Sequence, residues 1–140
     1  MNRIRSISYR PGRCGAATVE FALVAPLFLL LILGIIEFGR MLMVQQILTN
    51  ATREGARRAV IEGATAEEVR TLVDRYLSNA SVSGSTVTVT PHELGYLGFG
   101  DSVTVEATVP FDSVSWTPSP WFLGGSTLRA STVMQAERFQ

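Results

Sequence analysis

The feature that most constrains this sequence is an apolar stretch near its amino end. From Phe21 to Ile36, sixteen consecutive residues carry no charge, and most of them are Leu, Ile, Val or Phe. A helix over residues 16–44 is roughly 43 Å long at about 1.5 Å per residue. That length exceeds the roughly 30 Å hydrocarbon core of a bilayer. The sequence therefore predicts one transmembrane helix over residues 16–44, with one end that emerges from the membrane.

The charges on either side of this stretch predict its orientation. Residues 1–15 carry four arginines and no acidic residue, whereas residues 41–140 carry seven arginines and ten acidic residues, a net charge of −3. Basic residues that flank a membrane span remain in the cytoplasm. We therefore expect a single pass through the inner (cytoplasmic) membrane. Residues 1–15 form a basic cytoplasmic leader, and residues 45–140 form a periplasmic or extracellular domain.

The same stretch is unlike an ordinary secretory signal peptide. Its apolar part is longer than the roughly 7–15 residues usual for such a peptide, and no A-x-A-like cleavage site follows it. The single cysteine, Cys14, precedes the stretch and cannot form a disulfide within one chain. We expect no nucleic-acid partner, because the part after the span has no strong basic patch.

Beyond Arg40 the helical pattern becomes amphipathic without a break. Apolar or small residues recur at three- and four-residue spacings at Val44, Ile47, Leu48, Ala51, Gly55 and Ala59. We predict one continuous helix from near Ala16 to about Ile61, ended by Gly63. Thr65 and Glu68 form a capping-box signature for a second helix. The apolar face of that helix comprises Val69, Leu72, Val73, Tyr76 and Leu77.

The period then changes from helical to two, which indicates strands. Alternating apolar residues predict strands around Val87–Val89, Val103–Val109 and Thr127–Ala136. The predicted fold class is α+β and pilin-like. It has a long N-terminal transmembrane and amphipathic helix, a second short helix, and a small antiparallel sheet of about three strands. One face of this sheet is solvated and a helix covers the other.

Several polar and aromatic residues have two interpretations. Glu37 and Arg40, three residues apart, predict an interfacial ion pair, or alternatively a recognition role in assembly. Residues 111–125 predict a long loop. Its aromatic residues cover the edge of the core, or contact a partner or the membrane surface; they are Trp116, Trp121 and Phe122.

Catalytic chemistry has little support. The chain has one histidine, His92, and one cysteine, which the predicted membrane separates from it. No nucleophile–base pair and no metal-ligand cluster is therefore predicted. We expect no catalytic residue, no cofactor and no metal, and a protein that is not an enzyme.

The segment GAATVEFALVAPLFLLLILGIIEFGR, followed by NATREGARRAV, resembles the TadE-like family. Its members are pilin-like minor subunits (pseudopilins) of the tight-adherence, or Flp, pilus machinery. The segments DSVTVEATVPFD and LRASTVMQAE resemble the strands that close such domains. The resemblance covers residues 13–62 closely and residues 100–138 more weakly.

The resemblance implies a processing site and an assembly site. Gly15 is then the last leader residue recognised by a prepilin peptidase, which cleaves before Ala16. Glu20 becomes the fifth residue of the mature chain, the position of the glutamate in type IV pilin-like proteins. Phe21 follows it where Flp pilins usually carry Tyr. The implied partners are the peptidase, other pilin or pseudopilin subunits and the inner-membrane assembly platform, and the subunit could lie within the pilus.

The physical chemistry of Glu20 agrees with this role. A carboxylate near the bilayer centre costs about 2.5–3.5 kcal/mol, and less near the edge, so an intramembrane acid usually has a partner. Cleavage before Ala16 creates a new α-amine, which is mostly protonated at neutral pH. Glu20 of one subunit can meet the amine of a staggered neighbour. The alternative is an acid that snorkels to the headgroups.

We therefore expect a minor pseudopilin that a prepilin peptidase processes and that acts in pilus assembly or in a related secretion apparatus. The alternative function is an uncleaved, single-pass membrane-anchored binding domain in the cell envelope.

Overall fold

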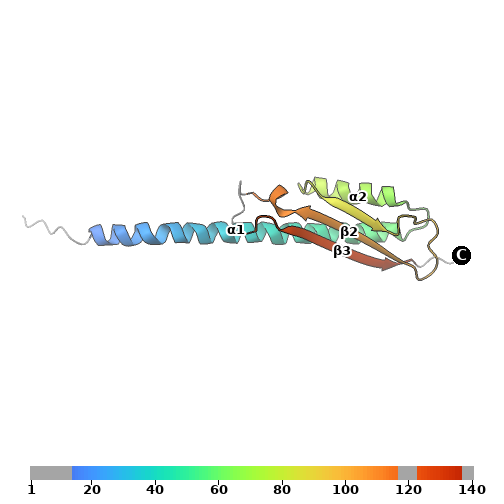
Figure 1. Ribbon diagram of the computed structural model, residues 1–140, viewed down its shortest axis with the longest axis horizontal. Coiled ribbons are helices and arrows are strands. Elements are labelled where there is room, and N and C mark those ends of the chain that lie inside the picture. The colour runs from blue at the N-terminus through green and yellow to red at the C-terminus, as the bar shows by residue number, and fades with distance from the viewer. Residues whose placement is uncertain (1–13, 117–122, 137–140) are drawn as a thin grey trace, which may run out of the picture. The chain divides into compact units, whose positions relative to one another are not determined.

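The computed structural model describes residues 14–116 and 123–136. Two helices and a sheet follow one another along the chain (Figure 1). The elements are α1 (Cys14–Ala59), α2 (Ala66–Asn79), β1 (Thr86–Thr90), β2 (Ser102–Pro110), a short 3₁₀ turn η1 (Phe111–Ser113) and β3 (Thr127–Gln135). The predicted α+β fold class is confirmed. The chain divides into two compact units, a first unit over Met1–Ile35 and a second unit over Ile36–Gln140.

The first unit is described from residue 14 onward, where it consists of the amino-terminal part of α1. Its apolar side chains are exposed, at 73% for Phe21 and 68% for Leu27. Pro26 lies inside the helix, a residue that membrane helices tolerate better than soluble ones. By length and composition α1 can cross a membrane, with a mean hydropathy of 2.7 over its most apolar 18-residue window. This apolar helix is the one that the sequence predicted.

The second unit buries the continuation of α1 in a hydrophobic core. One face of the helix packs there through Val44, Leu48, Ala51, Ala56 and Ala59, all fully buried. Gly55 lies at the closest approach of the helix to its neighbours. A Cβ at Gly55 would lie 2.5 Å from Val73 Cγ2 in α2 and 3.2 Å from Val105 Cγ1 in β2. The absence of a side chain at Gly55 therefore lets α1 approach α2 and the sheet together.

The two helix ends follow the predicted local signals. Helix α1 ends at Ala59, two residues before the predicted end, and the chain turns through Gly63. Gly63 has φ +75°, a left-handed conformation that favours glycine. At the start of α2 the Thr65 side chain accepts a hydrogen bond from the Glu68 backbone N–H at 3.2 Å. The predicted N-terminal cap of the second helix is confirmed.

The sheet has the order β1-β2-β3, and both neighbouring pairs are antiparallel. The register aligns Val89 with Val105 and Ala107 with Ala130, so apolar residues share one face. On β2 the inward side chains are fully buried; they are Val103, Val105, Ala107 and Val109. The other face is polar and carries the Glu106–Arg129 ion pair at 2.6 Å. One solvated face and one covered face agree with the prediction.

Two connections contribute more to the core than the sequence indicated. Phe111 was predicted to begin a loop, but it begins η1 and is the largest fully buried side chain among the described residues. Leu94 and Leu97, in the connection between β1 and β2, are 2% and 6% exposed. Trp121 and Phe122, and residues 1–13 of the predicted leader, lie outside the described residues.

Candidate assembly helix and the foot of the second unit

The predicted processing and assembly residues lie in the first two turns of α1. The helix begins at Cys14, and Gly15, Ala16, Glu20 and Phe21 are all exposed. Residues four apart in a helix share a face, so Ala16 and Glu20 are neighbours along one side of α1. In the part of the chain that the structure describes, the Glu20 carboxylate has no recorded hydrogen bond or ion pair. It is available to a cationic group.

The surroundings of Glu20 are apolar. Val19, Leu23 and Val24 are 61%, 69% and 61% exposed, so hydrocarbon side chains surround the carboxylate on the helix surface. In lipid or in a bundle of apolar helices such an acid needs a partner, because its desolvation is costly. The arrangement can therefore select a positively charged partner and fix the position at which that partner binds.

The predicted ion pair between Glu37 and Arg40 is not formed among the described residues. Arg40 is 6% exposed, and its guanidinium contacts two other segments. Nε donates a hydrogen bond to the Val114 carbonyl oxygen at 2.9 Å, and Nη2 donates to the Ser81 carbonyl oxygen at 3.4 Å. These contacts join α1 to Ser81, which follows α2, and to Val114, which follows η1. Tertiary contacts replace the local pair that the spacing suggested.

An aromatic ring completes the environment of Arg40. The guanidinium carbon lies 5.0 Å from the centre of the Trp116 ring, within the range of a cation–π interaction. Trp116 itself is 67% exposed, so one face of its indole contacts Arg40 and much of the ring remains accessible. The predicted role of Trp116 in covering the core is thus only partly correct. It covers a buried arginine at one end of the second unit.

Glu37 is the other buried charged residue of this region. It is 4% exposed, and its Oε1 atom has no hydrogen-bond partner within residues 14–116 and 123–136. We call the group Glu37, Arg40, Ser81, Val114 and Trp116 the foot of the second unit. The two charges are the only sequence signal for the foot, because Ser81 and Val114 contribute backbone carbonyls that any residue could supply.

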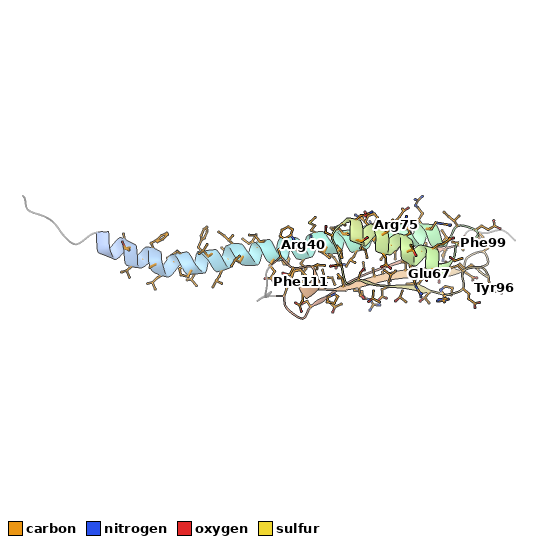
Figure 2. All side chains as sticks on the ribbon, turned by 90° about the horizontal axis from the view of Figure 1, so that it is seen from above. Arg40, Glu67, Arg75, Tyr96, Phe99 and Phe111 are labelled. Atoms are coloured by element: carbon orange, nitrogen blue, oxygen red, sulfur yellow. The ribbon has the colours of Figure 1, made fainter. Side chains whose placement is uncertain are left out.

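Aromatic residues are exposed at the opposite end of the second unit from the foot. Figure 2 shows Tyr96 and Phe99 at one end and Arg40 and Phe111 at the other. Tyr96 is 84% exposed and Phe99 is 67% exposed, while Leu94 and Leu97 of the same loop are buried. Sequence analysis treated this loop only as a connection. The spacing of three residues between Leu94 and Leu97 was the sequence signal that this loop contributes to the core.

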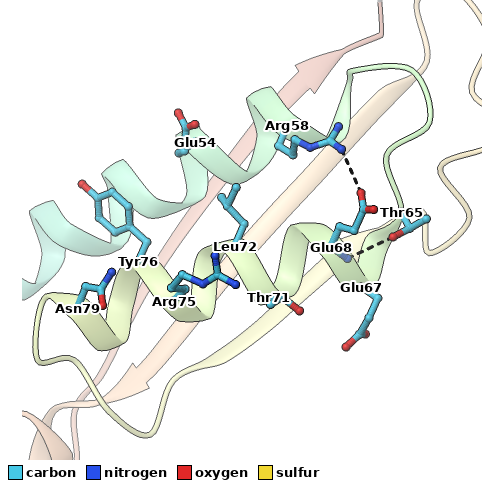
Figure 3. A pocket seen from close by; sticks show the side chains of 10 residues that line it. All are labelled: Glu54, Arg58, Thr65, Glu67, Glu68, Thr71, Leu72, Arg75, Tyr76 and Asn79. Carbon is cyan, nitrogen blue, oxygen red and sulfur yellow. Dashed lines mark hydrogen bonds and ion pairs between the residues drawn. The ribbon is translucent and has the colours of Figure 1, made fainter.

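An open groove lies between α1 and α2 (Figure 3). Its volume is about 680 Å³. It is lined by Glu54, Arg58, Thr65, Glu67, Glu68, Thr71, Leu72, Arg75, Tyr76 and Asn79. Arg58 and Glu68 form an ion pair across it at 3.1 Å, so much of its charge is neutralised internally. Among the described residues no group of three or more metal-ligating side chains occurs there or elsewhere.

A second ion pair lies on the exposed face of α1. Arg57 Nη2 approaches Glu54 Oε1 at 2.6 Å, one helical turn apart. The hydrogen bond from Arg57 lowers the pKa of Glu54, more than the burial of the carboxylate raises it. The same bond raises the pKa of Arg57. Both side chains of this pair are accessible to solvent.

The arrangement of helices and strands indicates a structural class of protein. A long apolar N-terminal helix, whose second part packs on a small antiparallel sheet, is a pilin-like layout. Residues 15–57 match the family model described as TadE-like protein. No curated protein and no solved structure matches the chain. The matched segment contains Gly15, Ala16, Glu20, Phe21, Glu37 and Arg40.

Proposed function

We propose that this protein is a minor pseudopilin of a tight-adherence (Flp-type) pilus or of a related secretion apparatus, and that it acts in pilus assembly. The observation that carries the proposal is the exposed Glu20 carboxylate on an apolar, membrane-capable helix. That helix lies inside the segment that matches the TadE-like model. The role is structural, not enzymatic.

The mechanism begins with membrane insertion and processing. The apolar helix enters the inner membrane with its basic leader in the cytoplasm and the second unit on the other side. A prepilin peptidase removes the leader between Gly15 and Ala16, and this cleavage frees the α-amine of Ala16. The freed amine is a cation at neutral pH, on the same helix face as Glu20.

Assembly then pairs unlike charges between neighbouring helices. Ala16 and Glu20 are four residues apart, so a neighbour shifted by about 6 Å along the helix axis brings its amine to the Glu20 carboxylate. Because the surrounding side chains are apolar, the attraction is stronger than it would be in water. A buried pair of this kind also specifies register. The partners are other pilin or pseudopilin subunits and the inner-membrane assembly platform.

The composition of the chain provides a direct test of processing. The sequence contains no lysine, so its α-amino terminus is its only primary amine. An amine-reactive reagent therefore labels one position. In cells with an active prepilin peptidase we expect the label on Ala16 and an intact mass that lacks residues 1–15. In cells without the peptidase the leader should remain.

A variant at the cleavage point supplies the control for processing. Gly15→Leu should keep the leader even when the peptidase is active, whereas Gly39→Ala, in the same helix, should be processed normally. A wild-type chain that keeps its leader in the presence of an active peptidase contradicts the proposed processing. That result would favour the alternative function, an uncleaved single-pass anchor that presents a binding domain.

Substitution of Glu20 tests the assembly step separately. Glu20→Gln preserves size and polarity but removes the charge, so we expect normal processing and membrane insertion with loss of recovery in the pilus or platform fraction. Glu93→Gln, an exposed acid in the second unit, should assemble like the wild type. Equal recovery of the Glu20→Gln and wild-type chains would argue against the charge-pairing mechanism.

A further inference from the structure

We infer that the foot of the second unit lies in the headgroup layer of the outer leaflet, with Trp116 as its lipid-contacting anchor. This inference rests on the proposed membrane insertion and deepens it. It proposes that part of the second unit contacts lipid. Neither the family match nor the charge-pairing mechanism requires such a contact. The partner is the interfacial zone of a phospholipid bilayer.

The first argument concerns length. Residues 16–36 are twenty-one residues, and at about 1.5 Å per residue they are about 31 Å long. They therefore span the roughly 30 Å hydrocarbon core, while the headgroups add about 5–7 Å on each side. The next three to five residues, beginning at Glu37, fall in that layer. Helix α1 includes both the apolar run and Glu37.

The second argument concerns the distribution of polar and apolar side chains at this level. Glu37 and Arg40 are buried within the second unit. By contrast, Phe38, Leu42 and Met43 are 51%, 49% and 50% exposed. The same two turns of α1 thus present hydrocarbon outward and keep their charges covered. Exposed hydrocarbon side chains at this level suit contact with the boundary between headgroups and acyl chains.

The third argument concerns Trp116. Tryptophan is enriched at membrane–water interfaces, because its indole has an apolar body and one N–H donor. Trp116 is 67% exposed, and its ring lies against Arg40, so it is held at the level of that residue.

The chemistry of the contact follows from the occupied donors of Arg40. Its Nε and Nη2 groups already bind the carbonyl oxygens of Val114 and Ser81. The guanidinium is therefore poorly placed to bind lipid phosphate, and the contact depends on the indole and the apolar side chains. Binding of the foot should consequently be insensitive to salt and to the anionic lipid content.

The test uses the full-length chain in phosphatidylcholine liposomes. Trp121→Phe leaves Trp116 as the only tryptophan. Liposomes contain lipids brominated either near the headgroup or near the end of the acyl chain, and aqueous iodide probes exposure to water. We expect a large loss of Trp116 emission with the headgroup-proximal bromines, a smaller loss with the deep bromines, and little loss with iodide. Added phosphatidylglycerol or salt should leave these losses unchanged.

A matched control places the probe at the other end of the second unit. In the Trp116→Phe, Trp121→Phe background, Tyr96→Trp puts a single tryptophan at an 84% exposed position far from the foot (Figure 2). Its emission should be quenched by iodide and not by brominated lipid. The contrast between the two single-tryptophan chains separates interfacial contact from general adsorption of the protein to the vesicle.

Flotation of the same liposomes separates the inference from the proposed function. If the chain floats with the lipid but Trp116 is quenched by iodide alone, the helix is inserted and the inference is wrong. If Trp116 is protected from both iodide and bromine, another protein surface covers the foot, and the lipid contact is again excluded. If the chain does not float, both the proposed insertion and the inference fail.

Discussion

At the scale of single residues, Arg40 has the largest structural role that its sequence neighbourhood did not reveal. Its fork-shaped guanidinium reaches two backbone carbonyls on different segments and lies against an indole ring. A lysine has one ammonium on a flexible stem and cannot reproduce this geometry. Arg40 therefore fixes the residues after α2 and after η1 to the helix, and it does so near the point where the apolar run ends.

Substitution of Arg40 tests this role. Arg40→Lys keeps the charge but loses at least one of the two directed hydrogen bonds, each worth about 1.5–3 kcal/mol when a charged group is involved. We expect the free energy of unfolding to fall by about 2–3 kcal/mol, measured by denaturant titration of the chain in detergent micelles. Arg53→Lys, on the exposed face of α1, should change it little. Equal effects of the two substitutions would contradict the assignment.

The ion pair of Glu54 and Arg57 predicts a small pH dependence. Arg57 holds the pKa of Glu54 below its ordinary value, so the native state favours the ionised carboxylate. The resulting stability is complete above the ordinary pKa of glutamate and is lost as the pH falls through the lowered value. It should be small, because both side chains are largely exposed.

Titration of the Glu54 carboxyl carbon by NMR checks this direction. In Arg57→Gln the midpoint should rise toward the ordinary value for glutamate, because the hydrogen bond and the positive charge are both removed. In Arg53→Gln the midpoint of Glu54 should stay close to that of the wild type. An unchanged midpoint in Arg57→Gln would show that the ion pair is not populated in solution.

At the scale of elements, hydrophobic periodicity and caps predicted both helices and all three strands. These signals are local, so the chain carries them without reference to its fold: Thr65 caps α2, and Val103 to Val109 alternate along β2. What they could not predict depends on residues distant in sequence. Phe111 is buried because the turn after β2 folds back on the core, and the contacts of Arg40 are with carbonyls that have no sequence signature.

The candidate site shows the same division. Glu20 can be proposed from the sequence because an acid within an apolar run is a local anomaly. The foot was not found, because Glu37 and Arg40 at a spacing of three resemble an ordinary helical ion pair. Only the packing of Val114 and Trp116 against α1 shows that Arg40 is engaged elsewhere.

Gly55 provides a prediction about the contact between elements. In a helix interior, alanine stabilises the helix by about 1 kcal/mol relative to glycine. However, its Cβ would lie 2.5 Å from Val73 Cγ2, and overpacking costs about 1–3 kcal/mol. We expect Gly55→Ala to lower the melting temperature, and Val73→Ala in the same chain to restore part of the loss. Gly39→Ala, which has nothing within 4 Å, should be neutral or stabilising. A stabilising Gly55→Ala would show that the helices can move apart freely.

At the scale of the whole molecule, the two units have opposite surface chemistry. The described part of the first unit exposes apolar side chains along α1, while the second unit gathers its apolar side chains into one core and exposes a polar sheet face. An environment of lipid or of other apolar helices suits the first unit, and water suits most of the second. The TadE-like match, over residues 15–57, includes the exposed apolar helix and only the beginning of the second unit.

The contacts between α1 and β3 join parts of the chain that are far apart in sequence. Gln45 donates a hydrogen bond to the carbonyl oxygen of Arg129, and Thr52 bonds to Thr132, across 84 and 80 residues of chain. The sheet that covers the core is therefore incomplete until β3 has been synthesised. A nascent chain released before β3 has a helix with an unburied apolar face and a sheet without its final strand. We therefore expect a chain truncated before residue 127 to be cleaved by proteases faster than the full-length chain.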